Sequence, residues 1–196
     1  MAAIGIMGGT FDPVHIGHLI AAETARGKCG LDEVWFIPSY APPLKDNEPG
    51  ADSRARYLMV QEAVRTNPFF RVLDIELVRG GTSYSYDTAA ELVRSYPEHS
   101  FSYIIGSDRI NDLPRWHRIE ELAELVSFIG LERPETPARP EGLPEYLRRK
   151  LRLALMPPIG ISSTDIRECL MSGQSVQYMV PDGVLDMIRR NGYYGT

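Results

Sequence analysis

Short apolar runs alternate with amphipathic segments along most of the chain. The apolar runs predict strands over residues 2–7, 33–37, 71–77, 101–105 and 126–131. The segments between them predict helices over residues 18–28, 53–65, 87–95 and 119–125, with Ser53 as the N-cap of the second helix. This alternation predicts an α/β fold of the Rossmann-like, doubly wound type, with a mostly parallel sheet and helices on both faces.

The length favours a single domain. A domain typically takes about 100–200 residues, and the chain has 196. The proline-rich stretch 132–144 is interpreted as a surface excursion, because only about fifty residues follow it. We therefore expect one domain over residues 1–196, with a helical C-terminal part from about residue 163.

Composition excludes several classes of protein. With 21 Lys and Arg against 26 Asp and Glu, the net charge is −5, so a broad nucleic-acid surface is not expected. No apolar run approaches the ~20 residues of a membrane span, and the opening residues lack the basic part of a secretory signal, which predicts a cytoplasmic protein without a membrane partner. Cys29 and Cys169 cannot form a disulfide scaffold or a cysteine zinc site. A homo-oligomer remains open.

The turn after the first strand carries the first candidate chemistry. It reads Gly8-Gly9-Thr10-Phe11-Asp12-Pro13-Val14-His15-Ile16-Gly17-His18. Glycines let backbone N–H groups approach an anion, and two histidines three residues apart share one face of a helix start, where they can donate to phosphate oxygens. The alternative is a structural turn with one capping and one core histidine. Zinc is not expected because two histidines without a cysteine are too few ligands, and no GK[ST] follows to make a Walker loop.

A second helix start has similar properties. The segment offers hydroxyl groups, free amides and a guanidinium to an anion. It reads Ile161-Ser162-Ser163-Thr164-Asp165-Ile166-Arg167. Taken alone it is most simply an N-cap. If both turns lie at the carboxyl edge of one parallel sheet, they converge on one ligand.

These two segments resemble the GxFDPxHxGH and ISSTxxR elements of the nucleotidyltransferase superfamily, whose members transfer adenylyl or cytidylyl groups without a covalent enzyme intermediate. The resemblance implies His15, His18, Lys45 and Arg167 as catalytic residues. It implies ATP binding by Gly8, Gly9, Thr10, Phe11, His15, Gly17, His18, Gly106, Asp108, Ile161, Ser162, Ser163, Thr164 and Arg167.

The middle of the chain is similar to the bacterial nicotinate-mononucleotide adenylyltransferases. The similarity lies in SYAPPLK (39–45), RGGTSYSYDT (79–88), IIGSD (104–108), LPRW (113–116) and ERP (132–134), together with the closing run 178–193. It implies binding of nicotinate mononucleotide by Ser39, Lys45, Thr82, Ser85, Asp108, Trp116, His117 and Arg133.

In this resemblance Trp116 stacks on the pyridine ring, while Thr82, the Ser85 hydroxyl and the His117 amide surround its carboxylate. Arg133 reaches the mononucleotide phosphate, and Asp108 accepts from a ribose hydroxyl. Two departures stand out: Leu44 replaces a usual histidine, and Ser85 replaces threonine. Trp35 is assigned to the core. The side chains of His99 and His117 are assigned to the surface or to the surroundings of the site.

The implied reaction is a direct attack of the mononucleotide phosphate on the α-phosphorus of ATP. Mg²⁺ would accompany ATP, held mainly by its phosphates, with no metal site of the protein's own. The alternatives are transfer to another phosphorylated acceptor, such as nicotinamide mononucleotide or pantetheine phosphate, and a non-catalytic nucleotide sensor. A dinucleotide-dependent dehydrogenase is excluded because no GxGxxG opens the first helix.

Overall fold

Six parallel strands form one sheet in the computed structural model, which describes residues 1–42, 49–132 and 140–196. The strands are β1 (Ala3–Gly9), β2 (Glu33–Pro38), β3 (Phe70–Val72), β4 (Ser100–Gly106), β5 (Ser127–Glu132) and β6 (Leu151–Leu155). Their order in the sheet is β3-β2-β1-β4-β5-β6, and every neighbouring pair is parallel. The predicted parallel α/β sheet is confirmed.

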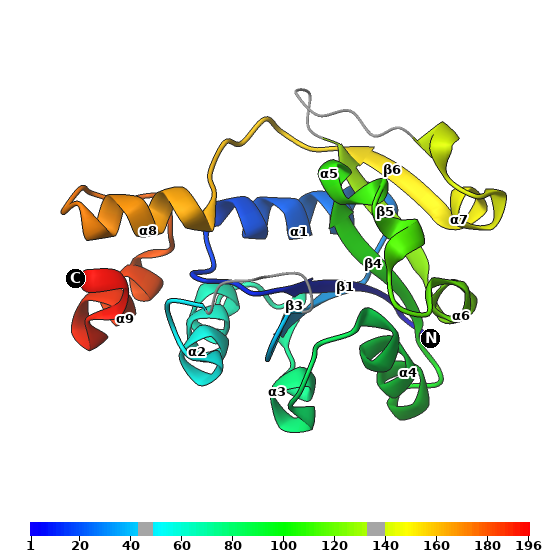
Figure 1. Ribbon diagram of the computed structural model, residues 1–196, viewed down its shortest axis with the longest axis horizontal. Helices are drawn as coiled ribbons and strands as arrows, with labels where there is room; N and C mark the ends of the chain where they lie inside the picture. The colour runs from blue at the N-terminus through cyan, green and yellow to red at the C-terminus, as the bar shows by residue number, and fades with distance from the viewer. Residues whose placement is uncertain (43–48, 133–139) are drawn as a thin grey trace.

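Helices cover both faces of this sheet (Figure 1). Residues of α1 (Ile16–Cys29) and α2 (Ser53–Val64) pack into one buried cluster, which also receives α8 (Ser163–Met171) and α9 (Asp182–Asn191). Residues of α4 (Ser85–Ser95), α6 (Ile119–Leu125) and α7 (Glu145–Lys150) pack into a second cluster on the other face. The short elements are α3 (Ile75–Arg79), α5 (Ser107–Ile110), η1 (Leu113–Arg115), η2 (Pro140–Gly142) and η3 (Tyr193–Gly195).

The strand order places a topological switch between β1 and β4. From β1 the chain proceeds through α1 to β2 on one side, and β4 with its successors lies on the other side. In open parallel sheets the carboxyl ends of the two central strands leave a crevice at such a switch, which is where ligands bind. The turns that follow β1 and β4 are therefore the first place to look for a site.

The predicted strand 71–77 is wrong beyond Val72. The β2–β3 ladder ends with the pair Phe36 and Val72, and Leu73 donates the last amide bond to Phe36. Pro38 has no N–H with which to continue the ladder. The chain instead forms α3 over Ile75–Arg79, since its apolar residues fit one turn of helix as well as a strand.

Two helix starts and one N-cap also differ from the expectation. Helix α4 begins at Ser85, two residues before the expected start. Helix α1 begins at Ile16, two residues earlier than expected, with His15 as its N-cap. The N-cap of α2 is Asp52 in place of Ser53, and its carboxylate accepts a hydrogen bond of 2.8 Å from the amide of Ala55. Trp35 is fully buried as expected, with its indole N–H donating to Glu33 over 2.7 Å.

The C-terminal helices lie at one end of the sheet, beside the start of α1 (Figure 1). The amide of Ile16 donates to the carbonyl of Met179 over 2.9 Å, which ties the segment before α9 to the first turn of α1. Within the described part of the chain, no helix is long and apolar enough to cross a membrane.

Candidate active site

The turn between β1 and α1 meets the start of α8 directly, although the two segments are far apart in sequence. The hydroxyl of Ser163 donates to the carbonyl of Pro13 over 2.9 Å. The Arg167 guanidinium donates to the carbonyl of Asp12 over 2.7 Å. The two motifs singled out in the sequence therefore share one location, beside the carboxyl end of β1.

His15 and His18 form a stacked pair at the start of α1. Their ring centroids are 3.7 Å apart with an interplanar angle of 30°. The amide of His15 donates to Nδ1 of His18 over 3.2 Å, and the edge of Phe11 lies against the His18 ring with centroids 5.0 Å apart. His18 thus has the capping role that the structural alternative requires. Both imidazoles nevertheless remain at the positive end of a 14-residue helix, where an anion is favoured.

Glycines in this turn are needed for close packing. A Cβ on Gly17 would lie 3.0 Å from Nδ1 and 3.1 Å from Cε1 of His15. A Cβ on Gly9 would lie 3.1 Å from the Phe11 ring, whose residue has a positive φ of 50°. Side chains at these positions would displace the rings, so the glycines set where the histidines lie.

The start of α8 is capped and its arginine is held in place. The Ser162 hydroxyl accepts from the amide of Asp165 over 3.1 Å, as the N-cap interpretation predicts. Thr164 is exposed, and its hydroxyl accepts from Arg167 over 3.4 Å. Ile161 is half-buried at the entry to this helix. Arg167 is thus fixed between Asp12 and Thr164 with part of its guanidinium exposed.

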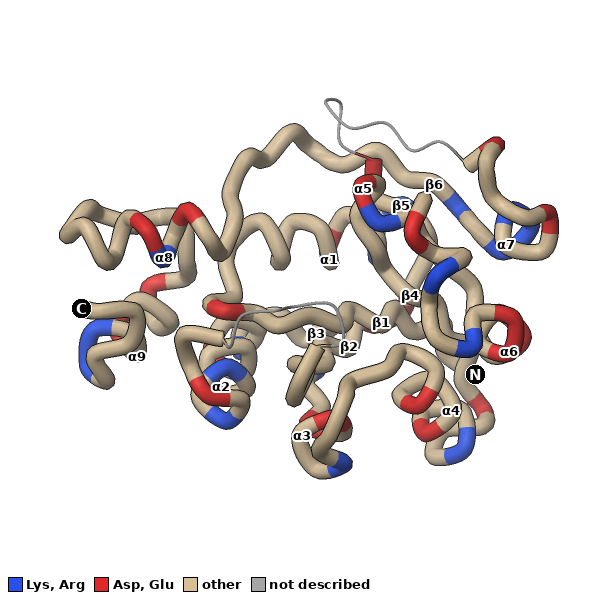
Figure 2. Tube along the Cα trace, viewed as in Figure 1, with Lys and Arg blue, Asp and Glu red and all other residues tan. Residues whose placement is uncertain are grey.

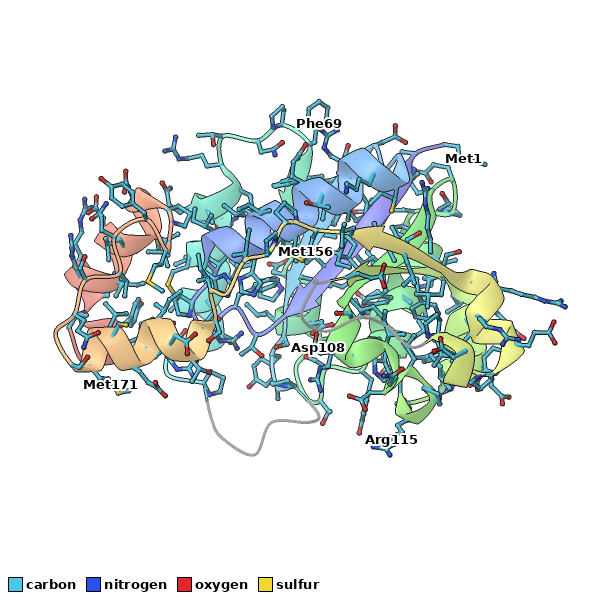
Figure 3. The ribbon with its side chains drawn as sticks, turned by 90° about the horizontal axis from the view of Figure 1, so that it is seen from above. Met1, Phe69, Asp108, Arg115, Met156 and Met171 are labelled. Atoms are coloured by element: carbon cyan, nitrogen blue, oxygen red, sulfur yellow. The ribbon has the colours of Figure 1, made fainter. Side chains whose placement is uncertain are left out.

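The end of β4 supplies the opposite side of the switch. Asp108 is exposed at the start of α5 (Figure 3), and a Cβ on Gly106 would lie 2.5 Å from its Oδ1. Ser107, beside it, is buried. Among the described residues, the hydroxyls of Ser107 and Ser39 are buried with no hydrogen-bond partner. These are two polar groups at the ends of β4 and β2 that a ligand or solvent could satisfy.

The residues assigned to the pyridine ring also come together. The Tyr103 hydroxyl donates to the carbonyl of Ser85 over 3.0 Å, and the half-buried Trp116 ring meets Tyr103 edge-on with centroids 6.2 Å apart. The His117 ring lies against the Tyr84 ring, with centroids 4.3 Å apart and the rings tilted by 30°. These contacts join the start of α4 to the turn after η1, so Ser85, Trp116 and His117 belong to one region.

Thr82 and Ser39 connect this region to the ends of β1 and β2. Thr82 is exposed and forms a parallel bridge with Ala41. The amide of Ser39 donates to the carbonyl of Gly9 over 2.9 Å. These backbone contacts connect the first turn to the aromatic region, and we call this connected edge the rim.

Lys45 and Arg133, together with Leu44, lie outside the described residues. The phosphate contacts assigned to Lys45 and Arg133 stay predictions. In the described part of the chain, no group of three or more His, Cys, Asp or Glu side chains could hold a metal ion.

Arg56 is a buried residue of the site region that the sequence interpretation missed. Its guanidinium donates to the carbonyls of Thr10 over 2.6 Å, Ser39 over 2.8 Å and Ala51 over 3.1 Å. Burial lowers the pKa of Arg56, and the negative charge of Asp12 partly opposes this shift. Arg56 therefore connects three segments of the chain: the one after β1, the one after β2 and the one before α2. It holds them in place beneath the rim.

Along the described residues, most helices carry both acidic and basic residues (Figure 2). The described positive groups near the two converging motifs include Arg167, the N-terminus of α1 and Arg56, which donates to the carbonyl of Thr10. This arrangement suits a small anionic ligand held at one point, because charges beyond about 10 Å are largely screened at physiological salt.

Comparisons with known proteins identify the family of this chain. Residues 6–169 match the family model described as cytidylyltransferase-like. The probable nicotinate-nucleotide adenylyltransferase of Oceanobacillus iheyensis is 44% identical over 196 residues, covering 100% of this chain and 98% of that protein. The nicotinate-nucleotide adenylyltransferase of Bacillus subtilis is 41% identical over 198 residues, covering 99% of each.

A solved structure supports the fold. The Plasmodium falciparum nicotinic acid mononucleotide adenylyltransferase, complexed with NaAD, aligns with a TM-score of 0.77 at 20% identity, covering 99% of this chain and 98% of that one. At this identity the likeness concerns the fold, and the family rests on the full-length relatives and the family model. The chain belongs to the cytidylyltransferase-like family and, within it, to the nicotinate-nucleotide adenylyltransferases.

Proposed function

We propose that the protein transfers the adenylyl group of ATP to nicotinate mononucleotide, giving deamido-NAD and pyrophosphate in NAD biosynthesis. The relatives that are 41–44% identical over the full length carry this activity in their names. The observation that carries the proposal is the direct contact between the turn holding the stacked His15 and His18 rings and the start of α8.

The proposal divides the rim into two subsites. The ATP phosphates lie against His15, His18 and Arg167, with the helix start from Ile161 to Thr164 beside them. The adenosine lies over the glycines of the first turn, Gly106 and Asp108. Nicotinate mononucleotide lies over Ser39, Thr82, Ser85, Trp116 and the His117 amide, with Lys45 and Arg133 completing its phosphate contacts.

The chemistry requires charge stabilisation more than proton transfer. An oxygen of the mononucleotide phosphate forms a bond to the α-phosphorus of ATP, and the bond from that phosphorus to the β-phosphate oxygen breaks, releasing pyrophosphate. The nucleophile is already an anion, so no strong general base is needed, and catalysis comes from alignment and from donors aimed at the developing charge. Mg²⁺ enters with ATP, because this ion keeps several waters and is bound mainly through substrate phosphates.

The direct test measures pyrophosphate release with ATP, Mg²⁺ and one acceptor at a time: nicotinate mononucleotide, nicotinamide mononucleotide or pantetheine phosphate. We expect the highest kcat/KM with nicotinate mononucleotide. Turnover confined to another acceptor would establish the alternative transferase. ATP binding without turnover on any acceptor would establish the nucleotide sensor.

The role of the histidine pair is tested by His18→Ala. Loss of one donor to the developing charge is expected to lower kcat by about 10²–10³-fold. His99→Ala is the control, because His99 lies next to the amino end of β1, where its Nδ1 accepts from the amide of Ala2 over 3.4 Å. A His18→Ala protein that turns over at the parent rate would remove His18 from the mechanism.

A cytoplasmic location and a homo-oligomeric assembly stay predictions of the sequence.

A further inference from the structure

The carboxylate of Asp12 is a buried junction between the first turn and the last residues of the chain. Only 4% of Asp12 is exposed. Its Oδ1 accepts from the Tyr194 hydroxyl over 2.8 Å and from the amide of Ala51 over 3.1 Å, while Oδ2 accepts from the amide of Gly50 over 2.8 Å. The carboxylate therefore accepts from three described donors, and the hydroxyl among them comes from the C-terminal turn.

Arg167 approaches the same residue in two ways. Its Nη1 donates to the backbone carbonyl of Asp12 over 2.7 Å and lies 3.7 Å from the carboxylate Oδ2. The guanidinium is thus shared between the carbonyl, the carboxylate and Thr164. The Asp12 carboxylate and an incoming anion compete for the Arg167 guanidinium. The charge and position of the carboxylate therefore set how available Arg167 is to the anion.

Tyr194 is packed against Gly50, whose amide also donates to Asp12. Its side chain is buried, and a Cβ on Gly50 would lie 3.0 Å from Cδ1 and Cε1 of its ring and 3.5 Å from Cδ of Arg167. The backbone of Tyr194 has a positive φ of 59° between Gly192 and Gly195, which also have positive φ. A left-handed conformation is unfavourable for a non-glycine residue, so the contacts of the side chain must hold this turn in place.

The Tyr194 hydroxyl remains a donor under ordinary conditions. Burial raises its pKa strongly, and the negative charge of Asp12 adds to the shift. A neutral hydroxyl that donates to a buried carboxylate stabilises the charged form of that carboxylate by a charge-assisted hydrogen bond.

We propose that Tyr194 is a positioning residue for Arg167: through Asp12, its hydroxyl holds the guanidinium at the start of α8 in an arrangement that can bind ATP phosphates. The proposal rests on the proposed function, which assigns Arg167 to those phosphates. It makes the C-terminal turn part of the ATP site, although Tyr194 acts through Asp12 and not on the substrate.

The experiment compares Tyr194→Phe, which removes only the hydroxyl, with Tyr193→Phe as the matched control. Binding of the non-hydrolysable analogue α,β-methylene ATP with Mg²⁺ is measured by calorimetry, and the KM values for ATP and nicotinate mononucleotide are measured separately. For Tyr194→Phe we expect the analogue Kd and the KM for ATP to rise about five- to tenfold, with the KM for the mononucleotide unchanged. Tyr193→Phe should bind the analogue as the parent does.

A double-mutant cycle separates the positioning of Arg167 by Tyr194 from a general loss of structure in the C-terminal turn. If Tyr194 acts through Arg167, Tyr194→Phe should cause no further loss of analogue affinity in an Arg167→Ala protein. The proposal is overturned by parent-like affinity in Tyr194→Phe, by an equal loss in the Arg167→Ala background, or by an equal rise in both KM values.

The calorimetric result is independent of the acceptor. Absence of turnover with nicotinate mononucleotide, combined with the expected loss of analogue affinity, would refute the proposed function and leave the role of Tyr194 supported. Turnover with nicotinate mononucleotide, combined with parent-like analogue affinity in Tyr194→Phe, would support the proposed function and overturn the role of Tyr194.

Discussion

Glu76 is a carboxylate buried beneath the start of α4, and its surroundings connect a single residue to the stability of the fold. Only 6% of Glu76 is exposed. It accepts from the Thr88 hydroxyl over 2.6 Å and lies 3.9 Å from the Arg79 guanidinium. Burial nevertheless outweighs these contacts and raises the pKa of Glu76 above its ordinary value of 4.5. The folded protein therefore binds this proton more tightly than the unfolded chain does.

The sign of this shift gives a pH prediction. The contribution of Glu76 to stability is complete below pH 4.5 and is lost as the pH rises through the raised pKa. Glu76→Gln cannot lose a proton there. We expect the melting temperature of the parent to fall relative to that of Glu76→Gln as the pH rises from 4.5 through the raised pKa.

The control for Glu76 is Glu91→Gln, which alters a carboxylate that also bonds Arg79, over 3.1 Å, but is partly exposed. Its melting curve should follow that of the parent more closely across the same range. Parallel pH profiles for the parent and Glu76→Gln would contradict the assignment of this pH dependence to Glu76.

Among single residues, those proposed to contact a ligand were easier to predict from the sequence than those that hold the contacting residues in place. His15, His18 and Arg167 could be singled out because a motif contains them. Arg56 could not, because nothing in the sequence distinguishes it from Arg54, which is exposed two residues earlier on the same helix. Tyr194 has the same difficulty: its partner Asp12 is 182 residues away, and only the folded chain brings the two together.

Among the elements, α1 shows why boundaries are harder to predict than elements. A helix after the first turn follows from the spacing of apolar residues, but its first residue depends on which side chain caps it. Here the side chain of His18 accepts from the amide of His15, so α1 begins at Ile16. The strand expected over residues 71–77 was shortened for a similar local reason, since Pro38 ends the ladder on the neighbouring strand.

Two glycines of α1 give a prediction with an internal control. A methyl group on Gly17 would lie 3.0 Å from the His15 ring, which must then move by a few tenths of an ångström. Because catalytic alignment is sensitive to such displacements, Gly17→Ala is expected to lower kcat roughly tenfold while the protein stays folded.

Gly27→Ala changes the same helix at an exposed position where an added Cβ meets nothing within 4 Å. It should keep the parent kcat and gain about 1 kcal/mol of stability from the better helix propensity of alanine. The measurements are steady-state turnover and denaturant unfolding. If the two variants have equal kcat, Gly17 does not set the position of the His15 ring for catalysis.

For the molecule as a whole, net charge says less about the ligand than the strand order does. A charge of −5 argues against a broad anionic partner, and Figure 2 shows acidic and basic residues on the same helices. The parallel order instead places the turns after β1 and β4 at one edge, and α8 returns to that edge from the far end of the chain. Alternating apolar runs predicted the parallel sheet. The placement of the C-terminal turn beneath Asp12 was not predictable, because it depends on packing among α2, α8 and η3.

The contacts between the first turn, α8 and the C-terminal turn predict which segments ATP should stabilise in the folded protein. A ligand that contacts both the start of α1 and the start of α8 stabilises the folded state by about 2.7 kcal/mol at a hundredfold excess over its Kd. Because Asp12 and Arg167 join these segments, amide hydrogen exchange with Mg²⁺ and α,β-methylene ATP should slow in residues 15–20, 163–168 and 193–195 together. Helix α7, which packs on the opposite face, provides the internal control and should exchange as in the free protein. Protection confined to the start of α1 would mean that α8 and the C-terminal turn fold beside the ATP site without belonging to it.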